Sequence, residues 1–151
     1  MSQYHPRLDL LVTTYSPQTP LYHMSTYQSN KPLYTASILS LVFLDHSFLM
    51  LALLDAHYLK YEHIISITLL LRDMSDFPII NPIYASYFKS PLPPARVTIS
   101  PPIKEAVNLS AIISTSARTG LHVQSRSYWA PANIGPYSQA ISVCLSLMKL
   151  I

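Results

Sequence analysis

The sequence predicts an α+β domain, and three observations along its middle predict it. Residues 64–71 form an apolar run that alternates with period two, as in a half-buried strand. A helical pattern of aromatic and apolar residues follows from 77 to 88, and alternating apolar segments return at 97–100 and 107–113. The order strand, helix, turn, strand, strand is typical of a small α+β unit.

The composition narrows the possible functions. The formal charge is +3, and no run of basic residues exists, so nucleic-acid binding is not indicated. Charged residues make up 11% of the chain, against about 25% in an average soluble domain. Such a surface is short of charge, which indicates poor solubility alone or burial against partners.

The first 32 residues are expected to be loop or disorder. They mix Tyr, Ser, Thr, Gln and Pro without sustained periodicity, and they lack the basic region and apolar core of a secretory signal. Both glycines of the chain, Gly120 and Gly135, lie in its tail. Because tight hairpins normally need glycine, we interpret residues 1–32 as a disordered or non-native leader.

Residues 33–54 form the most apolar window. About 20 apolar residues can span a bilayer, but Asp45 and His46 stand near the middle of this window, where polar groups are costly in lipid. We therefore expect no membrane span. The alternative that we favour is a strand from Ile38 to Phe43, followed by a core helix from about Asp45 to His57.

The strand expected at 64–71 has two different faces. One face is wholly apolar and the other is mixed, which predicts a strand that packs against helices on one side. The apolar face consists of Ile65, Ile67, Leu69 and Leu71.

The helix expected after this strand has candidate N-caps, a buried stripe and one proline, Pro82, that is unfavourable inside a helix. Asp73 and Ser75 are both plausible N-caps. Pro78 falls in the first turn, where it does little harm, whereas an interior Pro82 costs about 3 kcal/mol and predicts a kink or a damaged copy of the domain. The buried stripe at helical spacing consists of Phe77, Ile80, Tyr84 and Tyr87.

Several short motifs in this stretch resemble the second half of the Rid (YjgF/YER057c/UK-type) family. They are Leu-Leu-Leu-Arg-Asp-Met-Ser-Asp-Phe at 69–77, Asn81, Tyr-Ala-Ser-Tyr-Phe at 84–88 and Pro-Pro-Ala-Arg at 93–96. The resemblance implies a chorismate-mutase-like mixed sheet with two helices on one face. Residues 33–116 would be that domain, with a degenerate N-terminal part.

The tail adds a second resemblance. Residues 121–140, with Tyr-Trp-Ala-Pro-Ala-Asn-Ile-Gly-Pro-Tyr-Ser-Gln at their centre, are similar to the start of another Rid-type unit. Residues 117–151 would then be a linker and the first strand of a second copy. A Rid-like unit followed by this long motif is similar to fungal diphthine–ammonia ligases, which carry an ATP-pyrophosphatase domain before two Rid-like domains.

The resemblance implies a small set of site residues. In Rid enzymes the arginine of Pro-Ala-Arg, here Arg96, holds the carboxylate of an imine or enamine that water then hydrolyses, and a guanidinium fork suits a carboxylate. A purely structural arginine is the alternative. The acidic residue that deaminating members carry in the last strand is matched by Asn108, which argues against deamination by this copy.

Tyr137 and Ser138 match the first-strand residues that line the Rid pocket. Because they belong to the second unit, the expected pocket is split along the chain. We hypothesise that a tail strand from Tyr137 to Leu147 docks onto the first unit and replaces its opening strand.

Other chemistry is not indicated. His46, His57 and His63 lack metal-ligand spacing, so no metal site is expected, and the lone Cys144 fits a reducing, cytoplasmic compartment. The chain has no phosphate-binding glycine loop and no Ser-Gly-Gly-Lys-Asp-Ser signature, so no cofactor is expected here, although the resemblance implies ATP for the full ligase.

Three functions remain open at this point. The chain could be a Rid-like fragment of a diphthine–ammonia ligase, which amidates diphthine on elongation factor 2 and which this fragment alone would not perform. It could be a free-standing enamine or imine deaminase. It could also be a non-catalytic assembly module, because Rid units commonly pack as homotrimers through their sheets.

Overall fold

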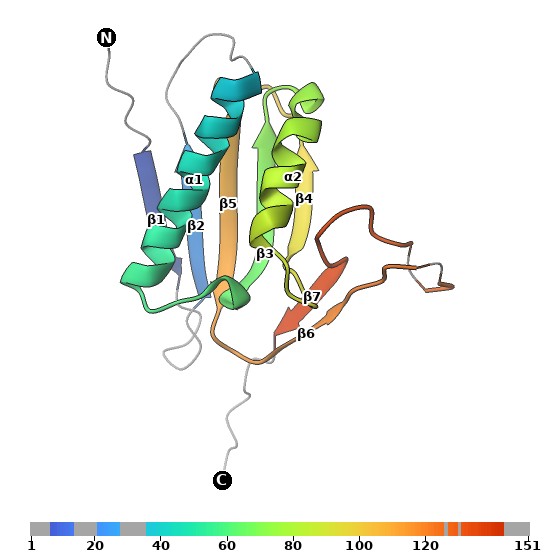
Figure 1. Cartoon of the computed structure of the whole chain (residues 1–151). Helices are drawn as coiled ribbons and strands as arrows, with labels where there is room; N and C mark the ends of the chain where they lie inside the picture. The colour runs from blue at the N-terminus through green and yellow to red at the C-terminus, as the bar shows by residue number, and fades with distance from the viewer. Residues whose placement is uncertain (1–6, 14–20, 28–35, 126, 130, 144–151) are drawn as a thin grey trace, which may run out of the picture.

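The computed structural model describes residues 7–13, 21–27, 36–125, 127–129 and 131–143. A five-stranded mixed sheet has the strand order β1-β2-β5-β3-β4, and both long helices cover the same face of it (Figure 1). The strands are β1 (Arg7–Thr13), β2 (Leu21–Tyr27), β3 (Ile64–Leu71), β4 (Ala95–Ile99) and β5 (Val107–Ser114), and the helices are α1 (Ala36–Ala56) and α2 (Phe77–Tyr87). The expected fold class is confirmed. We call this sheet with its helices the body.

For residues 7–13 and 21–27 the opening strands correct the expectation of a disordered leader, whereas the rest of 1–32 lies outside the described residues. β1 pairs antiparallel with β2, and β2 continues the sheet beside β5. Leu8, Leu10 and Val12 recur at alternate positions of β1, which suits a strand. The prediction relied on the scarcity of glycine, which matters for two-residue turns. Here seven residues, 14–20, separate the two strands. A link of that length does not need the glycine of a two-residue turn.

Helix α1 replaces the strand that was expected from Ile38 to Phe43. That expectation is wrong because a short apolar run cannot be assigned to strand or helix by periodicity alone. β2 and β3 are both antiparallel to β5, so they run parallel to each other, and a parallel crossover calls for a helix. The buried positions recur at helical spacing: Phe43, Ser47, Met50 and Leu54.

Strand β3 confirms the prediction for residues 64–71, with one local difference. The register shifts between Ile64 and Ser66, so Ile64 is buried under the helices where Ile65 was expected. A bulge of this kind shifts the side-chain alternation by one residue. From Ile67 onward the alternation follows the expected pattern.

Helix α2 also follows the prediction. Asp73 caps the short 3-10 turn η2 (Met74–Asp76), where its carboxylate accepts a hydrogen bond from the Ser75 amide at 2.9 Å. Pro78 lies in the first turn of α2 and Pro82 lies inside it, on the exposed side. Ile80 and Tyr84 are fully buried, and Phe77 and Tyr87 pack against the core at its border.

The tail forms a separate arm at the β4 side of the body (Figure 1). Its two strands, β6 (Arg118–Leu121) and β7 (Ala140–Val143), pair antiparallel with each other, and we call residues 118–143 the arm. The tail contacts the body, as hypothesised, but it does not replace an opening strand, because β1 and β2 occupy that place. Of the strand expected from Tyr137 to Leu147, residues 140–143 form β7, and residues 144–147 lie outside the described residues. The arm instead meets the opposite edge, through a parallel bridge between Ala95 and Ser138.

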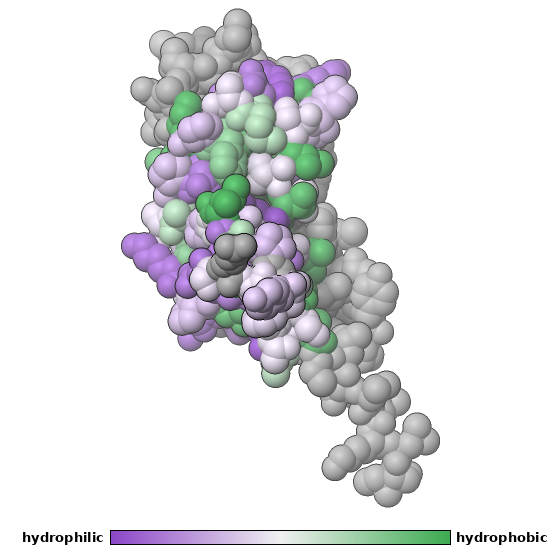
Figure 2. All heavy atoms as spheres, turned by 90° about the vertical axis from the view of Figure 1, so that its right-hand side faces the viewer, coloured by the Kyte–Doolittle hydropathy of each residue, from purple (hydrophilic) through white to green (hydrophobic). Residues whose placement is uncertain are grey.

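The hydrophobic core lies between the sheet and the helices. Seen from the side of the arm and β4, hydrophobic side chains are interspersed with polar ones over the surface (Figure 2). The side chains of Val97 and Ile99 in β4 remain about half exposed on the face of the sheet that the helices leave open. In the described part of the chain, no helix has the length and hydropathy that crossing a membrane requires.

Candidate functional site

Arg96 lies at the centre of the candidate site. It pairs with Ile67 across β3 and β4, and its side chain therefore points to the face that carries the helices. Three aromatic rings surround its guanidinium carbon, at centroid distances of 4.4 Å for Tyr84, 5.1 Å for Tyr137 and 5.4 Å for Phe77. Such contacts between a cation and ring faces are attractive, and more so when water is excluded.

Only part of the hydrogen-bonding capacity of Arg96 is used within the described residues. Its Nη1 donates to Oδ1 of Asn81 at 2.8 Å, and no described carboxylate forms an ion pair with it. Burial lowers the pKa of Arg96, and Tyr84 and Tyr137 act in the opposite direction. An arginine stays protonated in proteins and has five N–H donors, so this half-buried cation can bind a planar anion.

A cavity of about 260 Å³ opens beside Arg96. This volume lies near the lower end for small-molecule pockets, which begin at roughly 300 Å³. The hydroxyl of Thr98 is buried and has no hydrogen-bond partner among the described residues, so a polar ligand atom could satisfy it. The described lining of the cavity therefore combines one cation and two hydroxyl groups, those of Thr98 and Tyr137, with apolar side chains; it consists of Met74, Phe77, Arg96, Thr98, Ile134 and Tyr137.

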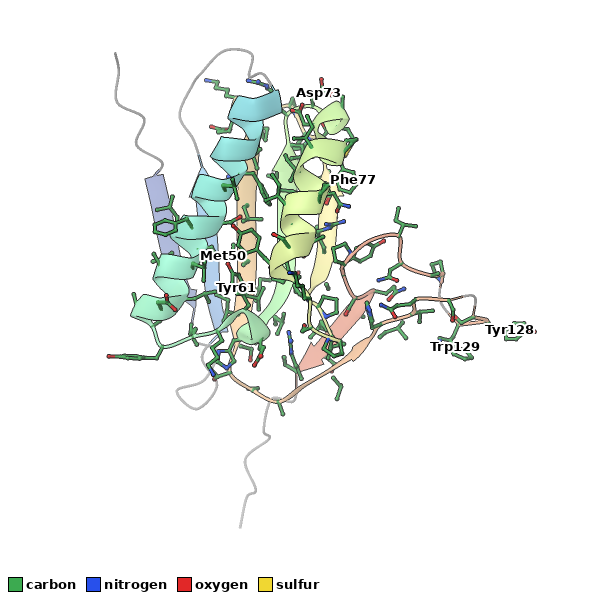
Figure 3. The ribbon with its side chains drawn as sticks, in the orientation of Figure 1. Met50, Tyr61, Asp73, Phe77, Tyr128 and Trp129 are labelled. Atoms are coloured by element: carbon green, nitrogen blue, oxygen red, sulfur yellow. The ribbon has the colours of Figure 1, made fainter. Side chains whose placement is uncertain are left out.

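The arm supplies one wall of this cavity. Tyr137 and Ile134 come from the loop before β7, and Phe77 comes from the N-terminal end of α2 (Figure 3). A Cβ atom on Gly135 would lie 3.2 Å from Nη2 of Arg96, so the absence of a side chain there lets the loop approach the cation closely. The structure thus brings Arg96 and Tyr137 together, as the split pocket requires.

Ser138 lies next to this pocket as an anchor rather than as a lining residue. Its side chain is fully buried, and its hydroxyl donates to the carbonyl of Pro93 at 2.6 Å. Its amide donates to the carbonyl of Pro94 at 3.1 Å. These two bonds tie the arm to the residues that precede β4, and they hold the neighbouring Tyr137 over Arg96.

Asn108 is not brought to the site. It pairs with Leu70 in β3, and both side chains belong to the half-buried face that the helices do not cover. Arg96 points to the opposite face of the sheet, so the two side chains cannot act on one ligand within a single chain. The sequence placed Asn108 in the correct strand but could not tell which face it would occupy.

Several residues of the site were not predicted as such. Thr98 lies two positions after Arg96 in the same strand, and period two would have placed both on one face. Asn81 was part of the motif, but its bond to Arg96 depends on how α2 crosses β4. Phe77 was predicted only as part of the buried stripe of α2. Met74 and Ile134 lay within the motifs at 69–77 and 121–140, but nothing in those motifs marked the two exposed side chains as pocket residues.

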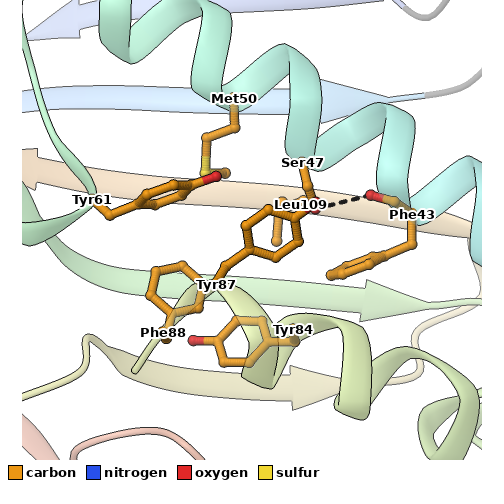
Figure 4. A pocket seen from close by; sticks show the side chains of 8 residues that line it. All are labelled: Phe43, Ser47, Met50, Tyr61, Tyr84, Tyr87, Phe88 and Leu109. Atoms are coloured by element: carbon orange, nitrogen blue, oxygen red, sulfur yellow. Dashed lines mark hydrogen bonds between the residues drawn. The ribbon is translucent and has the colours of Figure 1, made fainter. Parts of the chain in front are cut away.

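A second, interior cavity of about 10 Å³ lies between α1 and α2 (Figure 4). Its aromatic walls include Tyr61, Tyr84, Tyr87 and Phe88, and Ser47 donates across α1 to the carbonyl of Phe43. This space is at the lower limit for one water molecule. It therefore belongs to core packing and not to ligand binding. Within the described residues, no cluster of three potential metal ligands occurs.

The chain is similar to part of a known enzyme. It is 40% identical over 104 residues to diphthine–ammonia ligase of Saccharomyces cerevisiae, covering 58% of this chain. It is 38% identical over 92 residues to diphthine–ammonia ligase of Schizosaccharomyces pombe, covering 59% of this chain. The chain spans about 15% of the length of each of these relatives. No protein-family profile matches it.

The fold is found in solved structures as well. A protein from Salmonella typhimurium described as a putative translation initiation inhibitor aligns with a TM-score of 0.50 at 14% identity, covering 70% of this chain and 97% of that one. RidA from Psychrobacter sp. PAMC 21119 aligns with a TM-score of 0.45 at 16% identity, covering 68% of this chain and 84% of that one. In sequence, the chain is thus homologous to a portion of diphthine–ammonia ligase, and in structure it is a mixed α+β domain with the same fold as the Salmonella protein.

Proposed function

We propose that this chain is the Rid-like portion of a diphthine–ammonia ligase and that its Arg96 pocket binds a small carboxylate without converting it. The observation that carries the first part is the 40% identity to the yeast ligase. The observation that carries the second is the half-buried guanidinium of Arg96, which has only an amide oxygen as a described hydrogen-bond partner.

The proposal assigns ligation to the remainder of a larger protein. In that protein, ATP-dependent amidation of diphthine on elongation factor 2 would take place in the cytoplasm. The residues described here do not fit the phosphates of ATP, because no glycine occurs before Gly120 and no glycine-rich turn opens either helix. The Rid-like portion would assist through ligand binding and assembly, and residues 117–151 would begin a second Rid-like unit.

The pocket favours binding over deamination. Hydrolysis of an imine needs a group that positions or activates water, and the cavity lining that the structure describes contains no carboxylate or histidine. Asn108 has no carboxylate and points to the other face of the sheet. A free-standing deaminase therefore remains only the alternative to be tested.

A trimer through the sheet is part of the same proposal. Val97 and Ile99 are apolar and about half exposed on the open face, where a second copy could cover them. Light scattering on the intact chain should report a trimer, and Val97→Lys should shift it toward monomer. A monomer at all concentrations would contradict this part.

Binding of a matched pair of small molecules tests the pocket. We expect 3-methylbutanoate to bind the intact chain and 3-methylbutanamide, which has the same shape without the charge, to bind at least about tenfold more weakly. Arg96→Ala should abolish the preference, and Arg96→Lys should retain part of it because a lysine lacks the planar fork. Equal binding of acid and amide would contradict the carboxylate site.

A chimera tests the assignment to the ligase. The homologous segment of the yeast enzyme is replaced by residues 36–143, and diphthamide on elongation factor 2 is measured by mass spectrometry in cells without their own ligase. We expect the chimera to restore diphthamide, and a scrambled insert not to. Turnover of an amino-acid-derived imine by the isolated chain, lost in Arg96→Ala, would instead support the deaminase.

A further inference from the structure

We propose that ligand occupancy of the Arg96 pocket and docking of the arm on the body are coupled, so that a bound carboxylate holds the arm in place. This inference rests on the proposed carboxylate site and adds a conformational consequence to it. It concerns the arm, residues 118–143. Its described strands, β6 and β7, pair with each other, and a bridge between Ser138 and Ala95 joins the arm to the sheet.

The walls of the pocket come from two parts of the molecule. Phe77, Arg96 and Thr98 belong to the body, whereas Ile134 and Tyr137 belong to the arm. A ligand in the cavity contacts both parts at once, and it therefore binds the docked arrangement more tightly than an undocked one. By linkage, such a ligand must favour docking by the same factor as docking favours the ligand.

The arm is attached to the body through few contacts. Ser138 makes two hydrogen bonds to the carbonyls of Pro93 and Pro94, and Arg118 makes two more, from Nη1 to the carbonyl of Ile64 at 2.6 Å and from Nη2 to the carbonyl of Leu92 at 3.0 Å. No hydrophobic side chain beyond Ile113 is fully buried among the described residues. A segment held in this way opens at a lower free energy than the core unfolds.

The arm holds its own shape by bonds that undocking would not break. The side-chain amide of Gln139 accepts from the amide of Val123 at 3.0 Å and donates to the carbonyls of Val123 and Pro131. Nδ2 of Asn133 donates to the carbonyls of Gly135 and Tyr137 at 2.8 and 2.7 Å. The loop that carries Tyr137 is thus internally braced, and it can leave or approach Arg96 as one unit.

Hydrogen exchange on the intact chain measures the coupling. The amide of Ser138 reports docking because it donates to Pro94 of the body, whereas the amide of Gln139 donates to Leu121 within the arm. We expect saturating 3-methylbutanoate to slow exchange at Ser138 severalfold relative to Gln139 and to the amides of β5. The uncharged 3-methylbutanamide at the same concentration should leave all of them unchanged.

A pair of serine variants distinguishes weaker docking of the arm from a general loss of stability. Ser138→Ala removes the bond to Pro93 without touching the cavity wall, and it should weaken 3-methylbutanoate binding by about 2- to 10-fold. Ser47→Ala is the matched control, because Ser47 is also buried and its hydroxyl also donates to a carbonyl, that of Phe43 at 2.9 Å. This control should bind with unchanged affinity.

The possible failures are distinguishable. The first failure concerns the coupling alone. The wild-type chain would prefer 3-methylbutanoate over 3-methylbutanamide, but the acid would not slow exchange at Ser138, and Ser138→Ala would bind it with wild-type affinity. That result would contradict the coupling and leave the carboxylate site supported. If the wild-type chain shows no preference for the acid, the carboxylate site is overturned and the coupling falls with it.

Discussion

The body and the arm each keep their structure through a different kind of interaction. In the body, the buried apolar side chains of β3 and β5 meet those of α1 and α2, and every fully buried hydrophobic residue among those described lies at or before Ile113. In the arm, hydrogen bonds hold the chain in place. Gln139 and Asn133 form them within the arm, and Ser138 and Arg118 form them to the body. Tyr128 and Trp129 at the tip of the arm are 104% and 75% exposed and point away from the body (Figure 3).

This difference explains why the candidate site lies where the two parts meet. Apolar burial is non-directional and stabilises a large unit, whereas hydrogen bonds specify geometry but add little net stability each. The body can therefore present Arg96 rigidly, and the arm can bring Tyr137 to it in a defined orientation that is still reversible.

The largest effect should come from emptying the core of the body. Leu69 is fully buried in β3 between the sheet and the helices. Leu69→Ala should lower the free energy of unfolding by about 2–5 kcal/mol, because it removes buried methyl groups and leaves a cavity. Urea denaturation measures this, with the exposed Thr119→Ala in the arm as the control. A loss below about 1 kcal/mol would contradict the central role of this core.

The next effect should be confined to the arm. Arg118→Ala removes two charged hydrogen bonds to body carbonyls, and it should favour arm opening by about 2 kcal/mol. Hydrogen exchange at Ser138 should accelerate accordingly, while exchange in β3 and β5 stays unchanged. Arg118→Lys keeps the charge but not the planar fork, so its effect should be intermediate. Uniform acceleration through the body would show that the arm is not a separate unit.

The third effect concerns two buried phenols. Within the part of the chain that the structure describes, the buried hydroxyls of Tyr61 and Tyr84 have no hydrogen-bond partners, and burial raises the pKa of both above the ordinary value of 10.0. The folded state therefore keeps protons that the unfolded state loses above pH 10, so stability should fall as pH rises past that value. Tyr84→Phe should reduce this alkaline loss and should stabilise the chain by about 1 kcal/mol at pH 7.

Thermal unfolding between pH 7 and 11 measures both parts of that prediction. Tyr58→Phe is the control, because Tyr58 is almost fully exposed. Identical pH profiles for wild type and Tyr84→Phe would show that the phenol of Tyr84 is hydrated in solution.

The smallest effect should come from the contact between the two parts. Gly135→Ala places a methyl group about 3.2 Å from Nη2 of Arg96, and the end of that side chain must yield by a few tenths of an ångström. We expect global stability to change by less than about 0.5 kcal/mol. Binding of 3-methylbutanoate should weaken about twofold, measured by calorimetry. Unchanged binding would show that the loop is farther from Arg96 in solution.

Much of the body could be predicted, and the errors have specific causes. The alternation at 64–71 and the stripe of Phe77, Ile80 and Tyr84 correctly predicted β3 and α2, because each pattern matches one secondary structure. The run at 38–43 fits strand and helix equally well. It is helical because the chain must cross over between the parallel strands β2 and β3. The leader was misjudged from composition, although β1 alternates as a strand should.

The order of the central elements, the α+β class and the arginine at the site could be predicted from the amino-acid sequence, because periodicity and the Pro-Ala-Arg motif are local features. Two features became visible in the tertiary structure: Arg96 and Asn108 occupy opposite faces of the sheet, and Tyr137 contacts Arg96 from the arm, beyond the β4 edge. Which face a residue occupies depends on register, and which segment closes a pocket depends on contacts between residues distant in the chain. Neither is encoded within a short window of sequence, so only the folded chain shows them.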